Sequence, residues 1–322
     1  MSSPVAPSPF SSTLPLFQTV YDSTSLGWLK TCPRYYEYQM LHQYSPIGKS
    51  VHLIFGQLYA SGVEFYAKKR AEGLEHTRAS IEMVRFVLSL AGERSGDGTW
   101  LPWDPPKDSK DANLKNRYTL IRSLIWNVED RLGCPYSTLI LSNGKPAVEL
   151  SFNFHAFNIE GEEISLAGHL DEVVEERGTS RIMIKDDKTT KGPLNAQYFQ
   201  QYSPNNQMSL YTIAGKVLLG RPVSGVLIRA AQIGVNFTRF ATFPVARPSG
   251  VLEEWLEDAK FWIRQAHFFA RAGYWPTNDT ACNKYGGCPF VKVCSVSPSH
   301  RSAWLTQDFT KHEWNPLQSR GE

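Results

Sequence analysis

Two carboxylates and a lysine stand near the ends of two predicted strands, where a buried strand would ordinarily be apolar. In the second strand Asp186 and Lys188 follow Ile184 on one face, because side chains alternate between the two faces of a strand. Asp171 belongs to the preceding strand and would lie beside Asp186 if the two strands pair. Carboxylate oxygens are the ligands that hard divalent cations prefer. The pattern therefore predicts a metal site at one end of a sheet.

A second group of residues that could bind metal is a set of cysteines near the C-terminus. Cys282, Cys288 and Cys294 follow one another at intervals of six in CNKYGGCPFVKVC. A tetrahedral zinc site or an iron–sulfur cluster needs four ligands, so the fourth must come from Cys32 or Cys134 if it is a cysteine. Zinc usually draws its ligands as closer pairs, so the spacing favours an iron–sulfur cluster.

Cys32 is the stronger candidate for the fourth ligand. It precedes Pro33 at the predicted start of a helix, where unsatisfied N–H groups favour a thiolate. Cys134 lies in a loop and is interpreted as a structural or incidental thiol without a nearby partner. An odd number of cysteines, five, in a chain with no secretory signal argues against a disulfide framework.

The composition is that of an ordinary globular protein, with 42% hydrophobic and 20% charged residues in 322. This length predicts one elaborated domain, or one domain plus a lobe. The net charge of +3 does not by itself indicate a nucleic-acid partner. No apolar run approaches the roughly 20 residues that span a membrane, so a cytoplasmic location is expected.

The elements that must position these residues change character along the chain. The first 20 residues are rich in Ser and Pro, and amphipathic helices follow from Ser25 onward, among them helices over 75–93 and 111–131. From Lys145 the period changes to two, which predicts three strands in an antiparallel meander, then a helix after Ser203-Pro204, two more strands and a long helix over 250–272. This order predicts a mixed α/β (α+β) fold in which a central mixed sheet is flanked by helices.

Five regions are expected along the chain: a disordered arm (1–22), an N-terminal helical lobe with the first cysteine (23–144), a core that carries the predicted sheet and the two carboxylates (145–275), a cysteine-rich loop that clasps the fold (276–298) and a C-terminal tail (299–322).

Several segments together resemble the PD-(D/E)XK nuclease superfamily. They are SLGWLKTCPRYYEYQ, FGQLYASGVEFY, GHLDEVV, IKDDKTT, QMSLY and the cysteine loop, and they extend over roughly residues 23 to 295. The one-plus-three cysteine set resembles the RecB-like and AddB-like exonucleases with an iron–sulfur cluster, many of which belong to phages or mobile elements. The resemblance implies a restriction-endonuclease-like core and a metal-dependent DNA exonuclease acting in recombination, repair or phage DNA processing.

By this resemblance, Asp171 and Asp186 would bind Mg²⁺ or Mn²⁺, and Lys188 would orient the attacking water. Gln207 and Tyr211, four residues apart on one helix face, would help to hold the lysine or a phosphate. A [4Fe–4S] cluster, or alternatively Zn²⁺, would be held by Cys32, Cys282, Cys288 and Cys294.

One position departs from the family pattern. Related nucleases carry a metal-binding His four residues after the Gly of FG, and here that position is Ala60. Glu64 and Glu149 are the candidate replacement ligands, whereas His52 precedes the glycine and fits poorly. The departure leaves open a catalytically inactive DNA- or partner-binding protein that keeps the fold and the cluster. DNA, as single strands or duplex ends, is the expected partner, together with a possible recombination or replication protein and no membrane.

Overall fold

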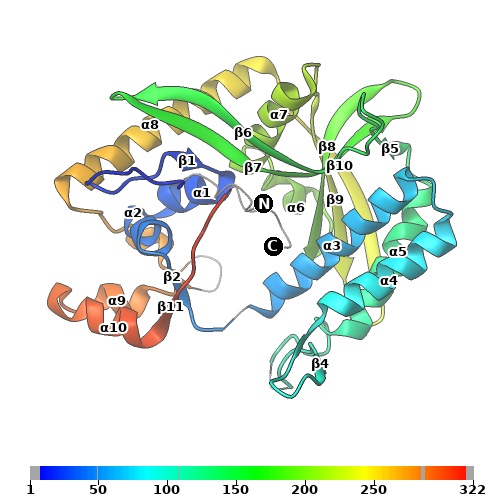
Figure 1. The fold of residues 1–322 in the computed structure, drawn as a ribbon, viewed down its shortest axis with the longest axis horizontal. Helices are drawn as coiled ribbons and strands as arrows, with labels where there is room; N and C mark the ends of the chain where they lie inside the picture. Colours follow the sequence, from blue (N-terminus) through cyan, green and yellow to red (C-terminus); the bar gives the residue numbers. More distant parts are fainter. Residues whose placement is uncertain (1–7, 49, 108, 284–286, 317–322) are drawn as a thin grey trace. The chain divides into compact units, whose positions relative to one another are not determined.

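The computed structural model describes residues 8–48, 50–107, 109–283 and 287–316, which form two units (Figure 1). Unit 1 consists of residues 1–48, 151–169 and 249–322, and unit 2 consists of residues 49–150 and 170–248. Each unit is thus assembled from stretches that are far apart in the sequence.

The described residues form helices α1 (Ser23–Thr31), α2 (Pro33–Tyr36), α3 (Val51–Ala71), α4 (His76–Leu90), α5 (Arg117–Leu132), α6 (Ala196–Gln200), α7 (Asn206–Leu219), α8 (Ser249–Ala272), α9 (Val291–Ser295) and α10 (Arg301–Asp308), with a π-helical turn at Glu37–Leu41 and 3₁₀ turns at Asp279–Ala281 and Pro298–His300. The strands are β1 (Val20–Tyr21), β2 (Tyr44–Pro46), β3 (Gly92–Arg94), β4 (Trp100–Pro102), β5 (Tyr136–Thr138), β6 (Val148–Ile159), β7 (Glu162–Glu176), β8 (Arg181–Thr190), β9 (Gly225–Ile233), β10 (Thr238–Ala246) and β11 (Phe309–Lys311).

The sheet of unit 2 is mixed. Its strand pairs are β7 with β8 antiparallel, β8 with β9 parallel, and β9 with β10 antiparallel, while β5 adds to β7. The predicted meander is thereby confirmed for β7 and β8, and β6 also pairs with β7. The parallel step follows from the connection through α6 and α7, because strands that run in the same direction need a long crossover.

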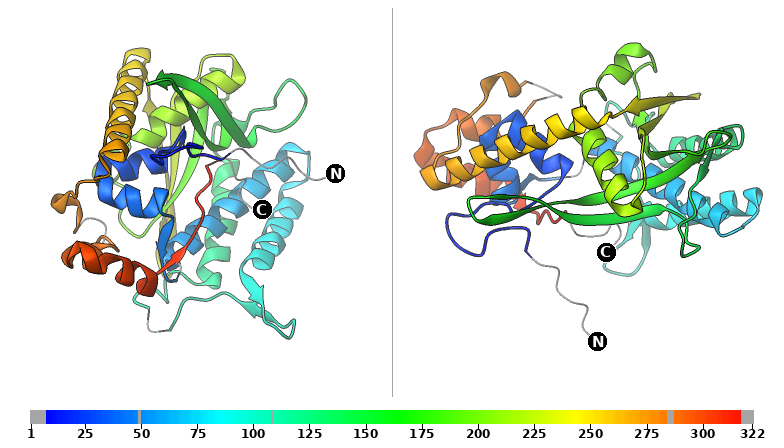
Figure 2. Two further views of the ribbon diagram at one scale, coloured as in Figure 1. Left: turned by 60° about the vertical axis from the view of Figure 1, so that its left-hand side comes forward. Right: turned by 90° about the horizontal axis from the view of Figure 1, so that it is seen from above.

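Helices cover both faces of this sheet, as expected. On one face α7 packs so closely on β8 that a Cβ at Gly215 would lie 2.7 Å from Ile184 Cδ1. On the other face α3, α4 and α5 lie side by side and share an apolar core with Ala231 and Ile233 of β9 (Figure 2). The even-numbered residues of β8 therefore face α7, and the odd-numbered residues face α3 and α5.

Unit 1 brings the beginning and the end of the chain together. Strand β2 pairs with β11 (Figure 1). Tyr38 of the π-helical turn packs with Phe290, Val293 and Leu305. Helix α1 begins with a capping box, in which Asp22 accepts a hydrogen bond from the backbone N–H of Ser25.

The N-terminal arm differs from the expectation. Residues 1–7 lie outside the described residues, but Phe10 bridges to Gln18, and Val20–Tyr21 pairs in parallel with β7. Gln18 is fully buried and accepts a hydrogen bond of 3.0 Å from the Tyr36 hydroxyl. The expected disorder is therefore wrong for the second half of the arm, because a polar segment can be held by a strand edge and by buried hydrogen bonds.

Two helix boundaries and one connection also differ. Helix α5 begins at Arg117 rather than near Asp111, because the Asn116 side chain caps it by accepting from the N–H of Thr119. Helix α4 ends at Leu90, and the following residues form β3. The short helix α6, before α7, was not expected. None of the helices in the described ranges combines the length and hydrophobicity needed to cross a bilayer.

Candidate active site

Asp171 and Asp186 lie where the β7–β8 ladder ends. The last registered pair is Glu172 with Lys185, so the next step of the two strands sets Asp171 against Asp186 on the face covered by α7. Both side chains are buried, with 7% of Asp171 and 1% of Asp186 exposed. Burial raises the pKa of Asp186 to about 6; Lys188 opposes this rise and the charge of Asp171 adds to it.

Lys188 links this carboxylate to α7. Its Nζ lies 2.7 Å from Asp186 Oδ2 and donates a hydrogen bond of 3.0 Å to Gln207 Oε1. The Gln207 amide in turn donates to the Tyr211 hydroxyl at 2.9 Å, as their spacing of four residues on one helix face permits. Helix α7 is fixed at its start by Asn205, which accepts from two backbone N–H groups. The structure thus joins four of the predicted residues in one chain of contacts.

Two tyrosines near this site were missed by the sequence analysis. Tyr198 of α6 and Tyr202 share a hydrogen bond of 3.0 Å between their hydroxyls. Burial raises the pKa of Tyr198; the charge of Lys188 opposes this rise and that of Asp186 adds to it. The segment carries no sequence pattern that would have indicated it, since it lies in a connection between two regular elements.

The candidate replacements for the missing histidine occupy different environments. Glu64 lies on α3, one turn after Ala60, and is only 8% exposed. Glu149 has a left-handed backbone at φ 56° near the start of β6, and its carboxylate forms an ion pair with Lys68. His52 lies 2.9 Å from an Asp111 oxygen.

The buried carboxylates fit a hard divalent cation. Asp186 Oδ2 is inaccessible to solvent and forms an ion pair with Lys188. Within the described part of the chain, no donor makes a hydrogen bond of good geometry to this oxygen. No group of three or more His, Cys, Asp or Glu side chains among the described residues is arranged as a complete metal site. Asp171 and Asp186 therefore suit an ion such as Mg²⁺, which keeps several waters and needs only one or two protein carboxylates.

The opposite face of the same strands carries a buried ionic network. Lys185 Nζ lies 3.0 Å from Glu172 Oε2 and also pairs with Asp187. Glu172 forms a second ion pair with Arg131, and these charges hold its pKa at about 2 although burial opposes that shift.

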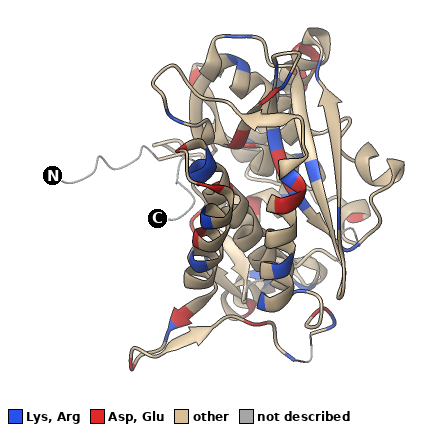
Figure 3. Ribbon diagram, turned by 90° about the vertical axis from the view of Figure 1, so that its right-hand side faces the viewer, with Lys and Arg blue, Asp and Glu red and all other residues tan. Residues whose placement is uncertain are grey.

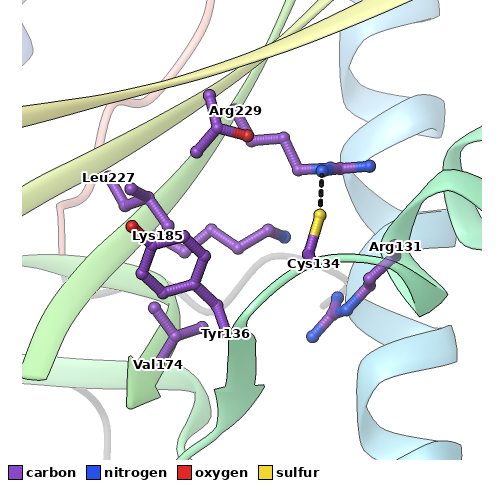
Figure 4. Close-up of a pocket in the computed structure, with 8 residues that line it drawn as sticks. Arg131, Cys134, Tyr136, Val174, Lys185, Leu227 and Arg229 are labelled. Carbon is purple, nitrogen blue, oxygen red and sulfur yellow. Dashed lines mark hydrogen bonds between the residues drawn. The ribbon is translucent and has the colours of Figure 1, made fainter. Parts of the chain in front are cut away.

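Cys134 belongs to this network, contrary to the expectation that it has no partner. Arg229 donates a hydrogen bond of 3.1 Å to its Sγ, and the same guanidinium binds Asp130 at 2.7 Å. Figure 4 shows the basic side chains converging on the small pocket beside the thiol. The alternation of charge along β8 was visible in the sequence, but its partners on α5 were not.

The four remaining cysteines all belong to unit 1. Asn278 N–H lies 3.4 Å from Cys32 Sγ, which brings the first cysteine to the last cysteine-rich segment. Burial raises the pKa values of Cys288 and Cys294, and the charges of neighbouring cysteines, including Cys32, act in the same direction. The thiols are therefore gathered, although they do not converge on one metal position in the described residues. Four thiolate donors are the set that an iron–sulfur cluster or zinc requires.

The sequence matches the PD-(D/E)XK nuclease superfamily over residues 24–295. The chain belongs to this superfamily. No curated protein matches the sequence significantly.

Two solved structures are similar to this superfamily member. One is a candidate exonuclease from Eubacterium rectale, 11% identical, with a TM-score of 0.45 over 82% of this chain and 86% of that chain. The other is SSO0001, 10% identical, with a TM-score of 0.31 over 76% of each chain.

Proposed function

We propose that the protein is a metal-dependent DNA nuclease, and specifically an exonuclease that hydrolyses phosphodiester bonds. The observation that supports this most directly is the buried pair Asp171 and Asp186 beside Lys188, in a chain of the PD-(D/E)XK superfamily. Carboxylates in such a position supply the oxygen ligands that phosphodiester hydrolysis with Mg²⁺ or Mn²⁺ needs.

Each side chain has a definite role in this proposal. Asp171 and Asp186 hold the metal ion, and a bound divalent ion lowers the pKa of water and shields the scissile phosphate. Lys188 orients the attacking water and offsets negative charge on the phosphate. Gln207 and Tyr211 fix the lysine through their hydrogen bonds. Glu64 and Glu149 are second-rank metal ligands in place of the histidine absent at Ala60.

The test is cleavage of end-labelled single- and double-stranded DNA while Mg²⁺ or Mn²⁺ is titrated. Asp186→Ala and Lys188→Ala should each lower the rate at least about 100-fold, the order expected for a group that stabilises developing charge. Asp97→Ala, which removes an exposed carboxylate from a loop, is the matched control. Cleavage that survives both active-site changes rules out this assignment, provided that circular dichroism shows a retained fold.

A catalytically inactive DNA- or partner-binding protein is the second candidate, and Ala60 is the observation that favours it. It predicts tight DNA binding without cleavage in any divalent metal. Cleavage by the unmodified protein that is lost in Asp186→Ala decides against it.

We also propose that Cys32, Cys282, Cys288 and Cys294 bind a [4Fe–4S] cluster, with Zn²⁺ as the alternative. The proposal is supported by the donor set and by the contact of Asn278 with Cys32. Anaerobic purification followed by iron, sulfide and zinc analysis separates the two, since a cluster absorbs near about 400 nm and zinc does not.

The biological setting that we propose is DNA recombination, repair or phage DNA processing in the cytoplasm, with a recombination or replication protein as a possible partner. The DNA substrate is argued from the nuclease superfamily. Assays with matched DNA and RNA strands test the substrate class.

A further inference from the structure

An exposed row of aromatic and arginine side chains lies on unit 2, outside the candidate active site. Helix α5 presents Tyr118, Arg122 and Trp126 at intervals of four, which places them on one helix face. Tyr118 is 75% exposed and Trp126 is 39% exposed. Side chains of this size are costly to leave in water unless they meet a partner.

The β9–β10 turn extends this row. Arg122 donates hydrogen bonds to the carbonyls of Gly234, Val235 and Phe237, so the helix and the turn form one surface. Phe237 is 40% exposed, and the Arg239 guanidinium lies 4.9 Å from the centre of its ring.

Rings and guanidinium groups alternate along this surface. The Arg122 guanidinium lies 6.0 Å from the Tyr118 ring centre and 5.2 Å from that of Trp126. Among the described residues neither Arg122 nor Arg239 forms an ion pair with a carboxylate, and the nearby acids Glu129 and Asp130 are paired with a histidine and Arg229. No carboxylate thus neutralises either charge within the described residues, and the exposed Arg239 stays available for an anionic partner.

These charges are local. Figure 3 shows Lys and Arg interspersed with Asp and Glu along the ribbon, in agreement with the small net charge. This surface therefore differs from a broad basic face, which would hold duplex DNA by charge alone. Alternating rings and cations are instead the features on which bases of a single strand stack while its phosphates are neutralised.

The row also lies at the same end of the sheet as the candidate active site. In the parallel β8–β9 register Lys188 is opposite Ala230 and Thr190 is opposite Gln232. The turn begins at Gly234, four residues after Ala230, which corresponds to about 13 Å along a strand. A strand that passes round this end of the sheet from the α5 face could reach the active site on the α7 face.

We propose that Tyr118, Arg122, Trp126, Phe237 and Arg239 form a stacking track for single-stranded DNA. This inference rests on the proposed nuclease function and deepens it, because it names the form of DNA that the chain holds. The bases stack on the exposed rings, Arg239 neutralises a phosphate, and Arg122 holds the rings of α5 against the turn. A protein partner would also fit aromatic and arginine side chains, and the experiment separates it from DNA.

The experiment measures binding of fluorescent oligo-dT by anisotropy, with lengths of about 6 and about 20 nucleotides, which lie within and beyond the ~4–16 nucleotide sites of single-strand binding folds. The variants are Tyr118→Ala, Trp126→Ala and Arg239→Ala. Each aromatic change should weaken binding of the longer strand about 5- to 100-fold, since stacking contributes about 1–3 kcal/mol per base. Binding of the shorter strand, which can stack on fewer of the rings at once, should weaken less.

The controls are Phe268→Ala, an aromatic on α8 whose exposed fraction of 59% lies between those of Trp126 and Tyr118, and Arg85→Ala, an exposed arginine on α4. Melting curves verify that the variants fold, which their exposure favours. The proposal is overturned if the track variants bind the longer strand as tightly as the unmodified protein does. It is also overturned if the control variants weaken binding as much as the track variants do. If the track variants keep DNA binding but lose a protein complex, the surface belongs to a protein partner. Absence of cleavage by the unmodified protein bears on the proposed nuclease activity instead, so the two failures are distinguishable.

Discussion

Lys188 is held by a carboxylate on one side and by a neutral amide on the other. The amide of Gln207 adds no charge, so its effect is on the position of the ammonium group. In the proposed nuclease, which must align water with a phosphate, a displacement of about 1 Å can cost on the order of 100-fold in rate.

Gln207→Leu should therefore slow cleavage about 10- to 100-fold while KM and the melting temperature change little, and Tyr211→Phe should have a smaller effect because the ring remains. Steady-state kinetics at saturating metal measures both. Gln307→Leu, an exposed glutamine on α10, should have no effect. A rise in KM alone would mean that Gln207 binds substrate and does not position the lysine.

Lys115 is a buried cation away from the active site. It is 2% exposed, its Nζ lies 4.2 Å from the Phe55 ring centre, and burial lowers its pKa to about 8. Its ordinary pKa is about 10.4, so the folded state binds fewer protons than the unfolded chain between these two values. The resulting cost to stability is complete below pH 8 and disappears as the pH rises towards about 10.4.

Lys115→Met should therefore raise the free energy of unfolding at pH 7 by about 1–2 kcal/mol, a figure reduced from the full shift because the cation–π contact is lost as well. Urea unfolding at pH 7 and pH 10 measures it. The advantage should shrink at the higher pH, and an advantage that is equal at both would contradict the assignment. Lys107→Met, in an exposed loop, is the control.

Individual residues were predicted unevenly. The sequence pattern indicated Asp171, Asp186 and Lys188, because polar side chains interrupt an apolar strand, and the structure brings them together with Gln207. Tyr198 left no such signal, because a tyrosine in a connection is ordinary in any globular protein.

At the scale of elements, strand β8 carries two different groups of polar side chains, one on each of its faces. Its even-numbered face carries the candidate active site, and its odd-numbered face carries Lys185 and Asp187 in the ionic network. Through Glu172 and Arg131 this network ties β7 and β8 to α5. The strand that carries the candidate catalytic residues is thereby fixed on its opposite face.

Glu172→Gln should lower the free energy of unfolding by about 3–5 kcal/mol, the cost of leaving buried cations without their anion. Asp104→Asn removes an exposed partner of Arg117 and should cost less than about 1 kcal/mol. Urea unfolding of both variants tests the contrast, and similar losses would show that the buried network does not stabilise the sheet.

The hairpin of β7 and β8, the helix α7 and the pair β9–β10 could be predicted because their periodicity and turn residues are local. Strand β1 could not be, since two residues cannot show a period, and their pairing depends on a strand more than 140 positions later. The ionic network was missed for a similar reason: Arg131 and Glu172 are 41 residues apart and only the fold makes them neighbours.

At the scale of the whole molecule, unit 1 contains Cys32 and the three later cysteines, and the proposed cluster would tie these distant stretches of the chain together. Cys32→Ser should lower the iron content of the purified protein by at least half and lower its melting temperature, because a lost ligand weakens both the cluster and the closure it provides. Cys134→Ser, which lies in unit 2, should retain the iron. Equal iron contents in both variants would contradict the proposed ligand set.

Unit 1 is held together by contacts between segments that are far apart in the sequence and are therefore synthesised at different times. Arg34 donates to the Trp275 carbonyl across 241 positions, and β2 pairs with β11 at the far end of the chain. Pairings between distant segments form last. During translation, therefore, the segment that contains Tyr36 stays exposed to solvent until its later contacts have been synthesised. The nascent chain thus offers chaperones and proteases a long interval of access at residues 33–46, until residues 275–311 have been made.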